Sequence, residues 1–274
     1  MRGPDFAERL CAALGSFDPV LDMRIQIRLE VSCHETFERA RDVVKRHGVD
    51  ALVLNDRLPH EALSAGKRPP RLDGQAIRAG RSPADHLALM RRLHDEMPLA
   101  RIRLAPFMAS LEGVRIGSHD DGTPQDRSRY RTLGARIAEF PMNRETAMAA
   151  KAAGDAVVLG APNIVRGGSH GKGVRARALV ASGLCDALAS DYHYPALHRS
   201  ALGLADDDLS LAEAWALVST IPARIMGLCD RGTIEPGQRA DLVILEEETR
   251  RIAATISGGR IAFAGDAFAR RLLA

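Results

Sequence analysis

The chain has 274 residues, of which 46% are hydrophobic and 27% are charged, so it is long enough and apolar enough to bury a full hydrophobic core. It carries 38 lysines and arginines against 35 aspartates and glutamates, and this near balance argues against a nucleic-acid partner. No apolar run approaches the roughly 20 residues that cross a bilayer. The sequence also has no signal-peptide core, and its cysteines form no CxxC pair. We therefore expect a cytoplasmic protein without a membrane partner.

The sequence predicts strands that alternate with helices. Short apolar or alternating segments predict six strands, at residues 24–31, 50–54, 114–117, 136–140, 155–159 and 186–189. Helical patterns, several with Ser, Pro or Asn at the start and Gly at the end, are found at residues 34–47, 83–97, 101–111, 124–133, 143–153, 174–181, 194–203 and 210–227. A loop rich in Gly, Pro and Arg is expected over residues 57–81. Alternating strands and helices imply parallel pairing with right-handed crossovers.

The carboxyl-terminal part of the chain follows a different pattern. A turn at residues 231–237 precedes three short apolar segments, at 240–245, 251–256 and 260–263. Gly258 and Gly259 separate the last two segments, which indicates a hairpin. We therefore expect an α/β domain over residues 1–229 and a small β segment over residues 230–274.

The most informative stretch runs from Val157 to Pro195. Its first apolar segment is followed by a basic, glycine-rich sequence that begins at Arg166, and its second by the tripeptide Ser-Asp-Tyr that begins at Ser190. Polar groups flanked by glycine, directly after short apolar strands, are typical of parallel α/β enzymes. Such enzymes carry their chemistry at the carboxyl ends of the strands.

This stretch closely resembles the α-D-ribose 1-methylphosphonate 5-triphosphate diphosphatases of phosphonate breakdown, a family of the amidohydrolase superfamily. Residues 162–170, Pro-Asn-x-Val-Arg-Gly-Gly-Ser-His, match that family nearly residue for residue. Residues 232–242, Gly-x-Ile-x-Pro-Gly-x-x-Ala-Asp-Leu, match the tail of the wider superfamily. The resemblance covers about residues 22–270.

The resemblance implies a TIM-like (β/α)8 barrel, flanked by the carboxyl-terminal part of a small β-sandwich. It also implies that the first two barrel strands of the family, with a metal-binding pair of the His-x-His type, are missing before Met1. Either the reading frame starts at an internal Met or the region has been lost. The first is our expectation, because an open remnant would expose a parallel sheet edge and the barrel interior to water.

Three residues match metal ligands of the family. His119 follows the third predicted strand in Ser-His-Asp-Asp, although a histidine there could instead hydrogen-bond Asp120 or Asp121. Asp191 matches the residue that binds metal and takes the proton from the attacking water, or it caps the next helix. Glu30 matches a family Glu, or is only the polar position of an alternating strand. The implied cofactor is a divalent metal, zinc first and manganese as the alternative.

Four residues after the fifth predicted strand match phosphate ligands of the family, namely Arg166, Ser169, His170 and Lys172. The intervening glycines let the backbone approach an anion, and the basic side chains supply charge near the start of a helix. These properties suit a triphosphate. The alternative, a flexible surface loop, is disfavoured by the match to the family.

The sequence departs from the family at two places. A family segment of the type Met-Asp-His-Thr-Pro-Gly-Gln is Leu-Asn-Asp-Arg-Leu-Pro-His over residues 54–60, so Asp56 replaces a histidine, with His60 as a nearby substitute. A His-x-x-His-x-Arg pattern is Met-Arg-Ile-Gln-Ile-Arg over residues 23–28. These changes indicate a paralogue with an altered substrate. Five other histidines show no partner pattern and are expected to be surface or packing residues: His34, His47, His86, His94 and His198.

We therefore expect a metal-dependent hydrolase of acid anhydrides, which releases pyrophosphate from a phosphorylated ribose phosphonate. One alternative is an amidohydrolase that acts on an amide or cyclic amide. The other is a catalytically inactive remnant kept for assembly with a partner. The expected partner is a small phosphorylated substrate, and the sequence leaves a homo-oligomer open.

Overall fold

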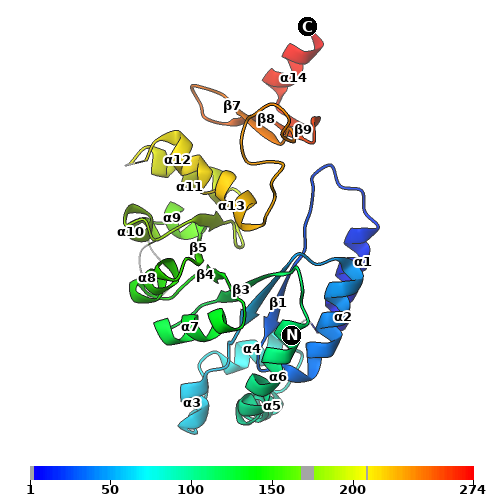
Figure 1. The fold of residues 1–274 in the computed structure, drawn as a ribbon, viewed down its shortest axis with the longest axis vertical. Helices are drawn as coiled ribbons and strands as arrows, with labels where there is room; N and C mark the ends of the chain where they lie inside the picture. The colour runs from blue at the N-terminus through cyan, green and yellow to red at the C-terminus, as the bar shows by residue number, and fades with distance from the viewer. Residues whose placement is uncertain (1–2, 168–175, 208) are drawn as a thin grey trace. The chain divides into compact units, whose positions relative to one another are not determined.

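The computed structural model describes residues 3–167, 176–207 and 209–274 (Figure 1). The chain forms two compact units, the first made of Met1–Ser16 and Ile25–Asp155 and the second of Phe17–Arg24 and Ala156–Ala274. Within the described ranges, no helix is both long enough and apolar enough to cross a membrane.

Four parallel strands form the sheet of the first unit. They are β1 (Gln26–Glu30), β2 (Ala51–Asn55), β3 (Arg115–His119) and β4 (Ile137–Glu139). Each strand pairs in parallel with the next one along the chain. The predicted α/β class, with parallel strands joined by helical crossovers, is therefore confirmed.

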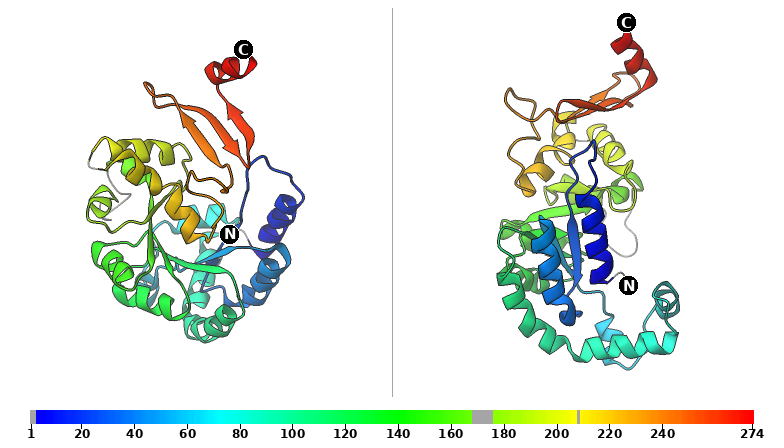
Figure 2. Two further views of the ribbon diagram at one scale, coloured as in Figure 1. Left: turned by 45° about the horizontal axis from the view of Figure 1, so that its top comes forward. Right: turned by 90° about the vertical axis from the view of Figure 1, so that its right-hand side faces the viewer.

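The helices of this unit follow the expected capping chemistry in most places. They are α1 (Pro4–Gly15), the 3₁₀ turn η1 (His34–Thr36), α2 (Phe37–His47), α3 (His60–Ser64), α4 (Leu72–Arg78), α5 (Pro83–Asp95), α6 (Met97–Ala109), α7 (Pro124–Thr132) and α8 (Arg144–Ala152). Helix α2 ends at Gly48 with φ of 59°, a left-handed conformation that glycine adopts without strain. The Ser82 hydroxyl accepts a hydrogen bond from the Asp85 amide at the start of α5, and Asn143 caps α8 through the Thr146 amide. Helices α1 and α2 lie side by side, as the two blue helices of Figure 2 show.

The loop expected over residues 57–81 is wrong, because this segment contains helices α3 and α4. Both are too short to show a helical period in the sequence, and isolated helices of this length are unstable in water. They are stabilised by tertiary packing instead, since Leu63 and Leu72 form a buried cluster with Met90 of α5. Helix α1 was likewise not expected.

The core of the first unit lies between β1, β2 and the helices α2 and α6. Strand β2 is buried at all five positions, as the apolar sequence of its first four residues predicts, and the fifth position is the polar Asn55. Phe37 of α2 stacks on Phe107 of α6 with 4.8 Å between ring centroids. This packing holds the carboxyl ends of β1 and β2 against a rigid layer of helices.

The second unit contains two parallel strands and a separate antiparallel sheet. The parallel strands are β5 (Ala156–Gly160) and β6 (Ala187–Ala189), and the helices are α9 (Ala161–Val165), α10 (Ala176–Ala181), α11 (Ala196–Ala205), α12 (Leu211–Ala216), α13 (Thr220–Ile225) and α14 (Asp266–Leu273). The antiparallel sheet has the order β7 (Leu242–Leu245), β8 (Ile252–Ser257) and β9 (Arg260–Ala264). The predicted hairpin at Gly258 and Gly259 is confirmed, and both glycines have positive φ. The domain division at residue 229/230 stays a prediction.

The single helix expected over residues 210–227 is wrong, because α12 and α13 are separate helices. The carbonyl of Leu217 accepts a hydrogen bond from the amide of Leu188 in β6, at 2.8 Å. That carbonyl therefore accepts a hydrogen bond from a strand and does not take part in the hydrogen-bond pattern of a helix. Ser219 then has φ of −135°, outside the helical region.

Candidate functional site at the carboxyl ends of the strands

The last residues of the four strands of the first unit form a continuous set, which we call the strand-end row. In the register of the sheet, Glu30 is paired with Asn55, Asn55 with His119, and His119 with Glu139. Because the strands are parallel, all four residues lie at the carboxyl edge. This is the edge that carries the chemistry in α/β barrels.

Glu30 is held at this edge by two hydrogen bonds. The side-chain amide of Asn55 donates to Oε1 of Glu30, and the backbone amide of Arg57 donates to Oε2 at 3.3 Å. Burial raises the pKa of Glu30, and these two hydrogen bonds oppose that rise. Glu30 is thus a fixed, partly desolvated carboxyl group, in contrast to a polar side chain that points freely into solvent.

His119 is the last residue of β3, whereas the sequence predicted that the strand ends at residue 117 and that His119 follows it. The residue is only 7% exposed, and its ring meets the Phe140 ring edge-on at 5.0 Å between centroids. Nδ1 of His119 is buried, and Oδ2 of Asp120 lies 3.0 Å away without the alignment of a hydrogen bond. Asp120 and Phe140 both have positive φ, a strained conformation that is often found at functional sites.

Glu139 ends β4 and contacts side chains of β1 on the same face of the sheet. Gln26 donates a hydrogen bond to Oε1 of Glu139 at 3.0 Å, and a guanidinium nitrogen of Arg28 lies 3.7 Å from Oε2. Burial raises the pKa of Glu139, opposed by His119, Arg28 and Gln26. Since β1 and β4 are separated by two strands, these contacts show that the four-stranded sheet curls strongly, as the wall of a barrel does.

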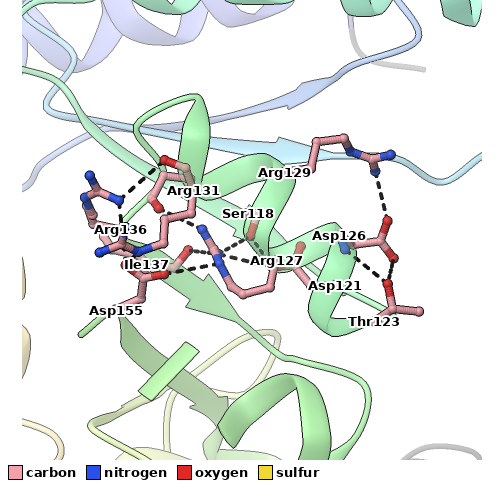
Figure 3. A network of polar contacts seen from close by, with 11 residues as sticks. Ser118, Asp121, Thr123, Asp126, Arg127, Arg129, Arg131, Arg136, Ile137 and Asp155 are labelled. Atoms are coloured by element: carbon pink, nitrogen blue, oxygen red, sulfur yellow. Dashed lines mark hydrogen bonds and ion pairs between the residues drawn. The ribbon is translucent and has the colours of Figure 1, made fainter. Parts of the chain in front are cut away.

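The loop after β3 is anchored by a buried arginine on its other side (Figure 3). Arg127 of α7 is 1% exposed and donates to Ser118 Oγ at 2.6 Å and to Asp121 Oδ2 at 3.1 Å. It also donates to the carbonyl of Ala135 at 2.7 Å, and its Nε lies 3.4 Å from Oδ2 of Asp155. Arg127 therefore fixes the residues on both sides of His119 and Asp120 without touching the strand-end row.

In the second unit, Asp191 lies two residues after β6 and is exposed. Its φ is 50°, and it does not cap the next helix, because α11 begins after Pro195 with no side-chain cap. The guanidinium carbon of Arg166 lies 5.4 Å from the ring centroid of Tyr192. The structure therefore brings Arg166 and the Asp191 segment together within this unit.

The remaining phosphate-ligand candidates, Ser169, His170 and Lys172, lie outside the described residues. Glu30 and His119 are both in register with Asn55, whereas Asp191 belongs to the second unit. In the parts of the chain that the structure describes, no three His, Cys, Asp or Glu side chains are grouped as a metal site. A catalytic metal usually has three protein ligands, so the described donor set does not by itself fit a metal. The metal set Glu30, His119 and Asp191 stays a prediction.

Residues 85–263 match the model of the Amidohydrolase family. The chain belongs to this family. The predicted superfamily is thus confirmed. The matched residues include β3 and β4, so His119 and Glu139 of the strand-end row lie within the family match.

Among relatives of this amidohydrolase is the α-D-ribose 1-methylphosphonate 5-triphosphate diphosphatase of Escherichia coli (strain K12), which is 34% identical over 238 residues. That match covers 84% of this chain but only 62% of the relative, so the chain spans less than two thirds of that protein's length. A 74-residue stretch is 43% identical to an adenine deaminase of Methylobacterium sp. (strain 4-46), over 27% of this chain and 13% of the deaminase. Among solved structures, a β-aspartyl dipeptidase from Fervidobacterium islandicum AW-1 aligns over 61% of this chain and 56% of its own, with 15% identity and a TM-score of 0.49.

Sequence reasoning missed two members of the strand-end row of this amidohydrolase. Asn55 and Glu139 were assigned no role, although each is polar and ends a strand. A polar residue at the last position of an otherwise apolar strand was the available signal. The exact strand ends, which are the least certain part of a sequence-based prediction, were needed to use it.

The remaining histidines were expected to be surface or packing residues, and several of them also have polar partners. His34 is buried, with its Nε2 3.1 Å from a carboxylate oxygen of Glu96 and its Nδ1 accepting from Arg103 at 3.0 Å. His198 has its Nε2 2.8 Å from the carbonyl of Arg250. His94 is bonded to His60, which the sequence could not show because the two residues are 34 positions apart.

Proposed function

We propose that this amidohydrolase cleaves a phosphoric anhydride bond of a phosphorylated ribose phosphonate and releases pyrophosphate. The observation that carries the proposal is the 34% identity to the E. coli diphosphatase across 84% of the chain. Arg166 supports it, since an exposed guanidinium next to the Asp191 segment suits a phosphate group.

In the proposed reaction, the Asp191 carboxylate takes a proton from the attacking water. Arg166, Ser169, His170 and Lys172 bind the phosphate oxygens of the substrate, and the basic side chains supply the positive charge. Amidohydrolases generally use divalent metals, and we propose zinc, with manganese as the alternative.

The decisive experiment follows pyrophosphate release from the ribose phosphonate triphosphate by phosphorus NMR. Purified protein is assayed with zinc, with manganese and after chelation, and metal content is measured by mass spectrometry. We expect turnover that needs a divalent metal and is lost in Asp191→Asn. Folded, metal-loaded protein that leaves the triphosphate intact would contradict the proposal.

Hydrolysis of a cyclic amidine or amide is a second candidate. It is favoured by the 43% identity to an adenine deaminase, although this stretch covers only 27% of the chain. The replacement of a family histidine by Asp56 is consistent with a changed substrate. Release of ammonia from adenine, without pyrophosphate release from the triphosphate, would select this candidate.

A further inference from the structure

We propose that Ser64 is an activated nucleophile that forms a covalent ester with acyl or phosphoryl electrophiles. It stands at the end of a chain of four side chains, Ser64, His94, His60 and Asp56, which we call the Ser64 relay. None of its four residues belongs to the strand-end row or to the Asp191 segment, although Asp56 directly follows Asn55 of the row. The proposal therefore does not depend on the proposed function.

The Ser64 relay is continuous at hydrogen-bonding distance from one end to the other. Nε2 of His60 lies 3.0 Å from both carboxylate oxygens of Asp56. Nδ1 of His60 lies 2.7 Å from Nδ1 of His94. Nε2 of His94 lies 3.1 Å from Oγ of Ser64.

The carboxylate determines which atom donates at every step of the relay. An ionised Asp56 can only accept, so Nε2 of His60 donates to it and Nδ1 of His60 is left as an acceptor. Nδ1 of His94 must then donate to His60, which leaves the lone pair of His94 on Nε2. That lone pair faces Oγ of Ser64, so the serine hydroxyl donates its proton to a histidine that can act as a base.

The two histidines are held in place by packing between helices. His60 and Ser64 are the first and last residues of α3, and His94 is near the end of α5. Leu63, which directly precedes Ser64 in α3, is buried and packs with Met90 of α5. The backbone amide of Leu58 also donates to Asp56 at 3.3 Å, which fixes the carboxylate. The relay thus joins the segment after β2, which carries Asp56, to two helices with a shared core.

Access and burial differ along the relay in the way a nucleophile requires. Ser64 is exposed, so an electrophile can reach its hydroxyl. The side chains of His60 and Asp56 are 33% and 17% exposed, so the far end of the relay is better shielded from water. A shielded carboxylate stabilises the positive charge that develops on the histidines when His94 takes the proton.

In the proposed step, Oγ of Ser64 attacks the carbonyl carbon or the phosphorus of the electrophile. A new bond to oxygen forms, and the bond between that centre and the leaving group breaks. The Ser64 proton passes to Nε2 of His94 and from there to the leaving group. With a carboxylic ester, water then attacks the acyl-serine, His94 takes its proton and returns it to Oγ, and free acid and Ser64 are released.

The test uses diisopropyl fluorophosphate, which loses fluoride when a serine attacks its phosphorus. The intact protein is treated in the presence of EDTA, and the modified peptide is identified by mass spectrometry. We expect one adduct, on Ser64, that is absent in Ser64→Ala. The rate of labelling should fall about 100-fold or more in His94→Gln, the range for removal of a general base. In His60→Gln and Asp56→Asn it should fall about tenfold or more.

His47→Gln is the matched control, because His47 is a partly buried histidine at the end of α2, outside the relay. It should label at the wild-type rate. Circular dichroism and thermal melting establish that each variant is folded, and His60→Gln serves as the base-chain variant if His94→Gln does not fold. Absence of an adduct on Ser64 in folded wild-type protein would overturn the proposal. So would labelling that is unchanged in both histidine variants, or labelling that EDTA abolishes, which would indicate a metal-bound nucleophile.

Discussion

The surroundings of Glu139 and Glu213 shift the pKa values of these two carboxyl groups in opposite directions. Burial raises the pKa of Glu139 at the end of β4. The hydroxyl and amide of Ser210 lower the pKa of Glu213, which completes a capping box at the start of α12. Their effects on stability should therefore have opposite dependences on pH.

For Glu139, a raised pKa means that the folded state holds its proton more tightly than the unfolded state does. Its stabilising contribution is complete below the ordinary glutamate pKa and is lost as the pH rises through the folded pKa. Relative to wild type, Glu139→Gln should become more stable as the pH rises from acidic to neutral. The measurement is the free energy of unfolding by urea at a series of pH values.

Glu213→Gln is the control, and its stability relative to wild type should change with pH in the opposite direction. The lowered pKa of Glu213 stabilises the fold above the ordinary glutamate pKa, and this contribution is lost as the pH falls through the folded pKa. Glu213→Gln should therefore lose stability relative to wild type at neutral pH and recover it in acid. The same pH trend in both variants would show that burial does not govern Glu139.

Helix α7 is attached to β3 and β4 through Arg127 (Figure 3). In Arg127→Met, the buried carboxylates of Asp121 and Asp155 would each lose an ion-pair partner. Arg131 would still lie 3.1 Å from Asp155. Removal of one member of a buried ion pair costs about 3–5 kcal/mol. We expect urea unfolding to show a loss of stability in this range. Metal or substrate binding should change less, because Arg127 can act on it only through the loop that follows His119.

Arg129→Met on the same helix is the matched control. Arg129 pairs with Asp126 at 3.0 Å, and its side chain is 43% exposed, so the pair is screened by water. Exposed pairs contribute about 0–1 kcal/mol. Equal destabilisation by the two substitutions would show that α7 is not attached through the buried network.

Elements with their own capping residues could be predicted from the sequence, whereas elements that depend on distant contacts could not. Helices α5 and α8 have an N-cap whose side chain bonds the first turn, so the local sequence determines where each begins. The break between α12 and α13 instead depends on a hydrogen bond from Leu188, which lies in another element. Helices α3 and α4 similarly depend on packing against α5, and so does the meeting of His60 and His94.

At the scale of the whole molecule, the family could be recognised from the glycine-rich segment and the tail motif, and residues 85–263 match the family model. The choice of substrate depends on fewer residues than membership of the family does. Asp191 and Arg166 were proposed because each matches the family after a predicted strand, and the contact of Arg166 with Tyr192 now joins their segments. Which of the two candidate reactions occurs is decided by whether this part of the second unit binds an anion.

Arg166→Ala distinguishes the two reactions. An arginine–phosphate contact contributes about 1.5–3 kcal/mol, so KM for the triphosphate should rise about 10-fold to 150-fold, and Lys172→Ala should act in the same direction. Hydrolysis of adenine, a neutral substrate, should be unaffected. Arg199→Ala is the control, because Arg199 is an exposed arginine on α11 of the same unit. Steady-state pyrophosphate release provides the measurement. Wild-type KM in both Arg166→Ala and Lys172→Ala would show that this segment is structural and that the anion is bound elsewhere.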